Sequence, residues 1–240
     1  MNNSEIGKVH PLSMIIRRIS EIFTEMGFEI AEGPLIEDEW HNFDALNVPH
    51  DHPARDMQDT FFVRGQEGKV MRTHTSNVQI RFMEKFVKEG RTPPFKIIAP
   101  GKVFRNEATD ATHEAQFHQV EGLVVGKGIS LAHLKSTLEE FLSRFYGFEV
   151  ASRFRPGYFP FVEPGVEVDL KFQDTWLEML GAGMVHPNVL RNVGIDPEEY
   201  SGFAFGMGID RLAMMKLQIP DVRLFYTGDL RLHNSLKQAK

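Results

Sequence analysis

The stretch VFRNEATDATHEAQFHQVEG, residues 103–122, decides how this sequence folds. Its two ends alternate like buried strands, and a polar segment separates them. Polar and charged side chains are nevertheless placed along it: Arg105, Glu107, His113, Gln119 and Glu121. Burying such groups is costly unless something pairs with them. We therefore expect them to face a ligand, although an arginine–glutamate ladder facing water would give the same pattern.

Side chains alternate between the two faces of a strand. Arg105 therefore shares a face with Glu107, and Phe117 shares one with Gln119 and Glu121. Folding the two strands antiparallel brings both sets over one surface. The sequence thus predicts a sheet whose floor is polar in its middle.

The composition is that of one globular domain spanning residues 1–240, because 240 residues suffice for a single mixed α+β core. A net charge of −6 argues against a broad basic face for nucleic acid. The absence of cysteine excludes disulfides and thiolate metal sites. No apolar run is long enough to span a bilayer and no signal peptide is visible, so we expect a cytoplasmic protein without a membrane segment.

Periodicity and capping residues place the elements. The apolar stripe and the terminal glycines predict helices over residues 11–26, 76–89, 131–146 and 208–217. Alternation predicts strands over residues 60–63, 95–107, 117–126, 166–172, 175–183 and 202–208. Residues 40–58 show no period and are expected to form a long ordered loop. This order favours an α+β fold with a mainly antiparallel sheet flanked by helices.

The segment GFAFGMGIDR, residues 202–211, is a candidate phosphate site. Gly206 and Gly208 let a ligand approach the backbone, and Arg211 falls in the first turn of the next helix, where free amides favour an anion. A tight turn without a ligand would also explain the two glycines.

The segment RTHTSNVQ, residues 72–79, begins a helix. Thr75 or Ser76 suits the N-cap position. In addition, His74, Ser76 and Gln79 could present donors and acceptors to a small zwitterion.

Two other groups carry weaker signals. Phe159 and Phe161 lie two positions apart in GYFPFVEPG, residues 157–165, which is usual for core residues and also suits an aromatic pocket. The histidines at 41, 50 and 52 match no common metal-binding spacing, so we expect no structural zinc there.

In this order, these segments resemble the catalytic core of the phenylalanyl-tRNA synthetase alpha-subunit family, a class II aminoacyl-tRNA synthetase. Residues 10–49, HPLSMIIRRISEIFTEMGFEIAEGPLIEDEWHNFDALNVP, resemble motif 1, which forms a dimer interface. The opening stretch resembles motif 2, and GMGIDR, residues 206–211, resembles motif 3. The resemblance implies the class II synthetase fold, with ATP and phenylalanine bound on the sheet.

The resemblance also implies roles for single residues. Arg105 would hold the ATP α-phosphate, Phe117 would stack on adenine, and Arg211 would cover its other side and reach the γ-phosphate. Glu107, His113 and Gly208 would lie near the nucleotide, and Glu178 would bind Mg²⁺. The residues implied to surround phenylalanine are His74, Ser76, Gln79, Gln119, Glu121, Phe159, Phe161, Ala182, Ala204 and Gly206.

The implied function is activation of phenylalanine to phenylalanyl-adenylate and its transfer to phenylalanine tRNA, with a beta subunit as partner and a possible homodimer through the motif 1 helix. The family's N-terminal tRNA-binding arm is expected to be absent. Gln58 and Asp210 differ from residues common in the family. A non-catalytic amino-acid-binding module, or an adenylating enzyme with another acceptor, would also fit the missing arm.

Overall fold

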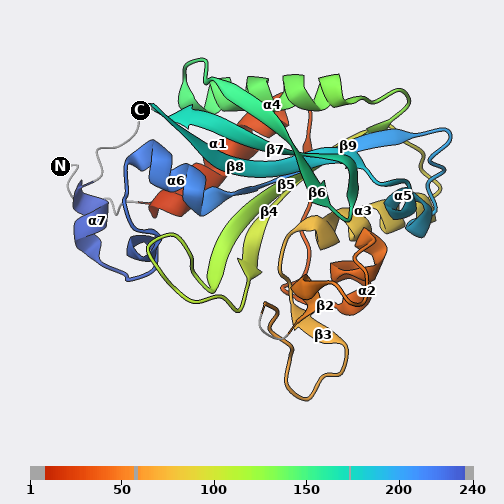
Figure 1. Cartoon of the computed structure of the whole chain (residues 1–240), viewed down its shortest axis with the longest axis horizontal. Coiled ribbons are helices and arrows are strands. Elements are labelled where there is room, and N and C mark those ends of the chain that lie inside the picture. The colour runs from red at the N-terminus through yellow and green to blue at the C-terminus, as the bar shows by residue number, and fades with distance from the viewer. Residues whose placement is uncertain (1–8, 57–58, 173, 236–240) are drawn as a thin grey trace, which may run out of the picture.

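At the centre of the computed structural model, which describes residues 9–56, 59–172 and 174–235, is a seven-stranded sheet (Figure 1). Its strands, in spatial order, are β1 (Glu29–Ile30), β4 (Phe95–Phe104), β5 (Gln116–Gly126), β9 (Ser201–Gly208), β8 (Thr175–Val185), β7 (Val162–Phe172) and β6 (Ser152–Phe159). All neighbouring pairs are antiparallel except β1 and β4. The predicted α+β class with a mainly antiparallel sheet is therefore confirmed.

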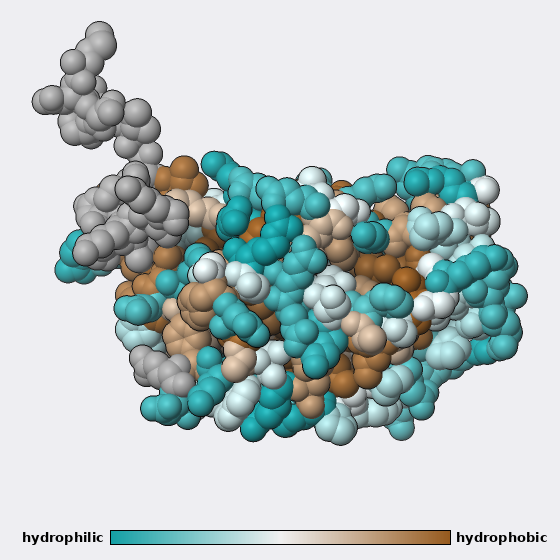
Figure 2. Space-filling view, turned by 90° about the horizontal axis from the view of Figure 1, so that it is seen from above, coloured by the Kyte–Doolittle hydropathy of each residue, from teal (hydrophilic) through white to brown (hydrophobic). Residues whose placement is uncertain are grey.

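One face of the sheet is covered by α1 (Pro11–Glu25), α4 (Leu131–Tyr146) and α6 (Ile209–Leu217), of which α1 and α4 lie above it in Figure 1. Their apolar stripes form one core with strand residues such as Val120 and Val168. In α4 the stripe points inward, while the side seen from above in Figure 2 shows hydrophilic side chains interspersed with apolar areas. In α4 Ser130 and His133 form a capping box, and Gly147 adopts a left-handed conformation.

The opposite face is covered by α3 (Ser76–Lys88) and α5 (Pro187–Asn192), together with a segment that the sequence left as a loop. That segment holds three short helices: α2 (Glu39–Asn42), η2 (Asp44–Leu46) and η3 (Pro53–Arg55). They are too short to show a period, so the expectation of a long ordered loop over residues 40–58 was wrong in part. Gln58 lies outside the described residues, as do residues 236–240.

The strand predictions need correction in several places, and β6 was not predicted at all. Residues 60–63 form no strand and contribute only an isolated bridge from Phe62 to Val70. A small sheet of β2 (Ile36–Asp38) and β3 (Lys69–Met71) was missed because three residues are too few for alternation to be visible. β4 ends at Phe104, so Arg105 and Glu107 lie in the loop that follows it and not in the strand.

Residues near the two ends of the described chain contact each other. After α6 come η4 (Val222–Phe225) and α7 (Leu230–Ser235). His10 precedes α1, where its Nδ1 accepts from the Leu12 amide and its Nε2 donates to the Phe225 carbonyl oxygen at 2.9 Å. Among the described residues, none of the helices combines the length and the apolar character required to cross a bilayer.

Gly122 in β5 tests how tightly the sheet packs on α1. A Cβ at this position would lie 2.1 Å from the Phe205 ring, and that ring stacks on Phe23 of α1. We expect Gly122→Ala to lower the free energy of unfolding by about 1 to 3 kcal/mol, because a full core cannot accept another methyl group. Urea unfolding measures the loss.

Gly126→Ala is the matched control on the same strand. Its added Cβ would approach its neighbours no closer than 3.4 Å, an ordinary contact. Equal stabilities for the two variants would contradict the packing argument.

Candidate active site

All the side chains that the sequence analysis assigned to a ligand line one cavity of about 730 Å³. This volume is within the range of small-molecule sites. The assigned residues that line it are His74, Ser76, Gln79, Arg105, Glu107, His113, Phe117, Gln119, Glu121, Phe159, Phe161, Glu178, Ala182, Ala204, Gly206, Gly208 and Arg211. The structure thus brings together residues from four strands, two helices and the loops between them, while their individual roles stay predictions.

One wall of the cavity holds a buried acidic group, Glu121 on β5, which is 5% exposed. It accepts hydrogen bonds from the Thr75 amide at 3.0 Å, from the Ser76 hydroxyl and from Gln79 Nε2 at 3.1 Å. These donors belong to the start of α3, where the helix dipole also favours negative charge. Burial nevertheless raises the pKa of Glu121 to about 7, because the ionised form loses its hydration.

His74 lines the same cavity and is in its neutral form at neutral pH. Its Nε2 donates to the Asn42 carbonyl oxygen at 2.9 Å. Burial, together with the nearby positive charge of Arg105, lowers the pKa of His74 to about 4. Because Nε2 carries the proton, Nδ1 is a bare acceptor, and it is buried without a partner in the described chain. Gln119 Oε1 is a second buried acceptor without a partner there.

Asn42, which the sequence analysis missed, holds this wall of the cavity in place. Its side chain donates to Thr73 Oγ1 at 3.1 Å and accepts from the Thr73 amide at 3.3 Å. It also accepts from Asn77 Nδ2 at 3.3 Å. Asn42 is fully buried, so α2 is fixed to the segment that carries His74.

The apolar part of the cavity is built around Phe159 and Phe161. They lie at the turn between β6 and β7, and their rings stack with centroids 5.9 Å apart. Gly181 on β8 makes room for the Phe159 ring, since a Cβ there would be 2.6 Å from it. Ala182 and Ala204 contribute small side chains to the walls.

Two arginines line the more open part of the cavity. Arg105 lies over the Phe117 ring at 5.1 Å, donates to the Thr73 carbonyl oxygen at 3.2 Å and stands 3.9 Å from Glu107. Arg211, in the first turn of α6, donates to the Glu178 carbonyl oxygen at 2.9 Å. Both are more than one third exposed, so their remaining N–H groups can meet an anion that enters from solvent.

Asp210, beside Arg211, is buried and was not recognised as a structural group from the sequence. It accepts from the His118 amide of β5 at 2.7 Å and from the Tyr226 hydroxyl. Burial of the Tyr226 hydroxyl, together with the negative charge of Asp210, raises the pKa of Tyr226. These bonds tie α6 and the C-terminal segment to β5, and they place Arg211 over the cavity.

The loop after β4 is held by its own side chains. Asp110 accepts from the amides of Thr112 and His113 at 2.6 Å and 2.8 Å, which is a local turn motif that the sequence could have signalled. The Ala111 carbonyl oxygen accepts from the Val222 amide at 2.9 Å. The C-terminal segment therefore supports this loop as well.

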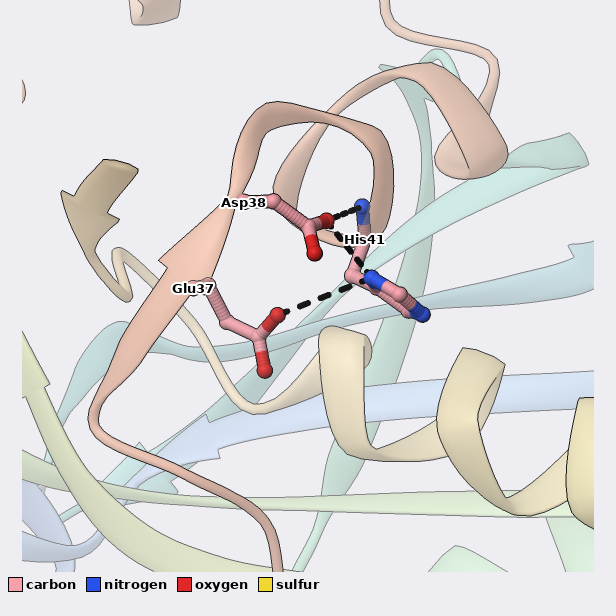
Figure 3. A group of neighbouring side chains, drawn as sticks. All are labelled: Glu37, Asp38 and His41. Carbon is pink, nitrogen blue, oxygen red and sulfur yellow. Dashed lines mark hydrogen bonds and ion pairs between the residues drawn. The ribbon is translucent and has the colours of Figure 1, made fainter. Parts of the chain in front are cut away.

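Figure 3 shows Glu37, Asp38 and His41, whose ligand atoms lie close enough to hold a metal ion. The negative charge of this group is already balanced by basic side chains of the protein, because Arg81 donates to both carboxylate oxygens of Glu37 at 2.6 Å and 2.7 Å. Lys69 lies 3.6 Å from Asp38. The arrangement is that of an ion-pair network between β2 and α3.

Comparison with known proteins identifies the class. The sequence matches the family described as tRNA synthetases class II core domain (F) over residues 1–236. Curated relatives named phenylalanine--tRNA ligase alpha subunit include that of Caldicellulosiruptor saccharolyticus, 53% identical over 98% of this chain and 70% of the relative. That of Coxiella burnetii is 54% identical over 97% of this chain and 69% of the relative.

A third relative of the same name, from Laribacter hongkongensis, is 55% identical over 94% of this chain and 67% of the relative. The chain belongs to the class II aminoacyl-tRNA synthetases, and within them to the family of phenylalanine-tRNA ligase alpha subunits. The resemblance noted from motifs 1, 2 and 3 is confirmed.

The pKa of Glu121 predicts a pH dependence of stability. Because the fold favours the protonated carboxyl, its contribution is fully present below about pH 4.5 and is lost as the pH rises through about 7. His74 acts in the opposite direction: its lowered pKa gives a contribution present above 6.5 and lost as the pH falls through about 4. The contribution of His74 is the same in the wild type and in a variant of Glu121, so the difference in their free energies of unfolding isolates the contribution of Glu121.

We measure the free energy of unfolding of Glu121→Gln and of the wild type in urea, without substrate. As the pH rises from about 5 to about 8, we expect the wild type to lose about 2 kcal/mol of this free energy relative to the variant. Glu67→Gln makes the same charge change at an exposed position and serves as the control. Parallel stability curves for wild type and Glu121→Gln would contradict the assignment.

Proposed function

We propose that this chain activates phenylalanine with ATP to form phenylalanyl-adenylate, and transfers the phenylalanyl group to phenylalanine tRNA as the catalytic alpha subunit of the enzyme. The observation that carries the proposal is one cavity that joins a buried acidic wall and a stacked aromatic pair to two exposed arginines. Family membership supports the same activity, because the relatives are named for it.

The acidic wall suits the ammonium group of an amino acid. Glu121 supplies the countercharge, while His74 Nδ1 and Gln119 Oε1 are acceptors that find no partner in the described chain. An ammonium group has three N–H donors and would satisfy all three acceptors. The bound ammonium would also favour the ionised carboxylate, so phenylalanine binding is coupled to loss of the proton from Glu121.

The apolar wall suits the phenyl ring. Phe159 and Phe161 offer the edges and faces with which aromatic rings prefer to pack, worth about 0.5 to 1.5 kcal/mol per pair beyond burial. Ala204 and Ala182 would bound the ring. A tyrosine hydroxyl would be crowded and unpaired there, although apolar pockets reject an added hydroxyl only about a hundredfold.

The reaction itself requires positioning and charge. A carboxylate oxygen of phenylalanine forms a bond to the α-phosphorus, the bond from that phosphorus to the bridging oxygen breaks, and pyrophosphate leaves with the electron pair. Negative charge gathers on the α-phosphate during this step, so the Arg105 guanidinium stabilises the transition state more than the ground state. Phe117 and Arg211 would hold the adenine between them, with Glu107, His113 and Gly208 beside the nucleotide.

Mg²⁺ typically binds through one or two carboxylates together with substrate phosphates. Glu178 fits this role, because it lines the cavity and its side chain is 59% exposed. Arg155 lies 3.7 Å from this carboxylate, which is beyond direct hydrogen-bond distance. When bound, the ion would neutralise phosphate charge.

Under the same proposal, residues 1–240 form one catalytic domain. Its partners are a beta subunit and tRNA, and the reaction takes place in the cytoplasm. A homodimer through the helix of motif 1 has less support, because the apolar stripe of α1 is buried within the chain. The segment after that helix exposes Ile30, Leu35 and Ile36, each at least 43% exposed, and is the better candidate for a subunit contact.

Arg105→Ala tests the proposed function. We expect phenylalanine-dependent exchange of pyrophosphate into ATP to fall at least about a hundredfold, because a group that stabilises the transition state is lost. The Kd for phenylalanine, measured by calorimetry, should stay within about twofold of the wild-type value. Arg105 contacts the wall proposed for the amino acid through the Thr73 carbonyl oxygen, and phenylalanine binding does not require that contact.

Arg231→Ala removes an equally charged side chain that is 91% exposed and pairs with Asp229. This control should retain full exchange. Unchanged exchange in Arg105→Ala would refute the motif 2 role.

Ala204→Gly tests the end of the ring pocket. Removing the methyl group opens space for a para substituent, so we expect the ratio of kcat/KM for para-chlorophenylalanine to that for phenylalanine to rise about tenfold. Ala99→Gly removes a buried methyl group from β4 and is the control for general loosening of the sheet. Equal substrate ratios in Ala204→Gly and the wild type would contradict the assignment.

A further inference from the structure

Asn47 lies at the end of η2, in the segment that the sequence left as a loop, and contacts the turn that carries the aromatic pair. Its Nδ2 donates to the Pro160 carbonyl oxygen at 2.8 Å, although the two residues are 113 positions apart. Its Oδ1 accepts from Asn188 Nδ2 of α5 at 3.0 Å. Both ends of the amide group are therefore used.

The turn between β6 and β7 depends on such contacts from outside. Pro160 has no N–H group, so the turn offers one donor fewer. The Phe161 carbonyl oxygen accepts from the His186 amide at 2.9 Å, and the preceding Pro160 carbonyl is held by Asn47. Together these two bonds fix the peptide planes on either side of Phe161.

The backbone at Asn47 narrows the choice of residue. Its φ is 60°, in the left-handed region, which glycine, asparagine and aspartate adopt most readily. Of these three, only asparagine can donate to one neighbour and accept from another through its side chain. Both demands at this position are thus met by asparagine.

We propose that Asn47 is a positioning residue that sets the selectivity of the cavity for phenylalanine, by holding the Phe159–Phe161 turn at a fixed distance from the acidic wall. Asn42 lies five positions earlier in the same segment and fixes the residues before α3 that include His74. The segment therefore spans the amino-acid pocket, with one asparagine on the ammonium side and one on the ring side. This inference rests on the proposed function and adds a specificity determinant that lies outside the residues assigned to the ligands.

The test compares three variants of the full chain, assayed with a beta subunit. Asn47→Asp keeps the left-handed backbone and the acceptor for Asn188 but replaces the donor to Pro160 with an oxygen. Asn47→Gly keeps the backbone and removes both bonds. Asn192→Ala removes contacts of 3.4 Å and 3.2 Å to the carbonyl oxygens of Asp44 and Ala45, so it loosens the same segment without touching the turn.

We expect KM for phenylalanine in pyrophosphate exchange to rise about fivefold in both Asn47 variants, because each of them loses the hydrogen bond to the Pro160 carbonyl oxygen. KM for ATP should change less than about twofold, and activation of tyrosine relative to phenylalanine should increase. Asn192→Ala should match the wild type in all three.

An unchanged KM for phenylalanine in Asn47→Asp, an equal rise in KM for ATP, or the same changes in Asn192→Ala would each overturn the inference. Should the wild type show no exchange, the proposed function fails separately. The Kd for phenylalanine, from calorimetry on the same variants, then decides the role of Asn47 by the same comparison.

Discussion

The site depends on one buried carboxylate that the start of a helix satisfies only in part. Glu121 receives three hydrogen bonds from the first turn of α3, and all three donors are neutral groups. Arg72 and Arg105 act on it through their charges at a distance. A buried anion without a direct ion pair is unstable, so the site is prepared for a cation of the right size. The same bonds join β5 to α3, which makes the binding group part of the contact between sheet and helix.

Much of the fold could be predicted from the sequence because its long elements repeat. The stripes of α1, α3 and α4 extend over three or more turns, and their terminal glycines lie where the helices end. Short elements gave no such signal, as β2, β3 and the helices of residues 39–55 show. The end of β4 was misplaced because Arg105 continues the alternation, although the strand gives way to a loop held by Asp110.

The site divides in the same way. Alternation along β5 was enough to place Phe117, Gln119 and Glu121 together, and resemblance to a family supplied the aromatic and phosphate positions. The supporting roles of Asn42, Asn47 and Asp210 escaped detection, because each residue has a partner 31 or more positions away and belongs to no repeating pattern. Hydrogen bonds of this kind become visible only once the chain is folded.

The contacts near the two ends of the chain bear on the order of assembly during synthesis. His10 binds the Phe225 carbonyl oxygen, and Tyr226 binds the carboxylate next to Arg211. When α1 and most of the sheet have left the ribosome, Phe225 and Tyr226 have not yet been released. The contacts that these residues make beside α6 therefore form late. The nascent protein can collapse early around its strands, but its nucleotide side takes final shape only after residue 226 has left the exit tunnel.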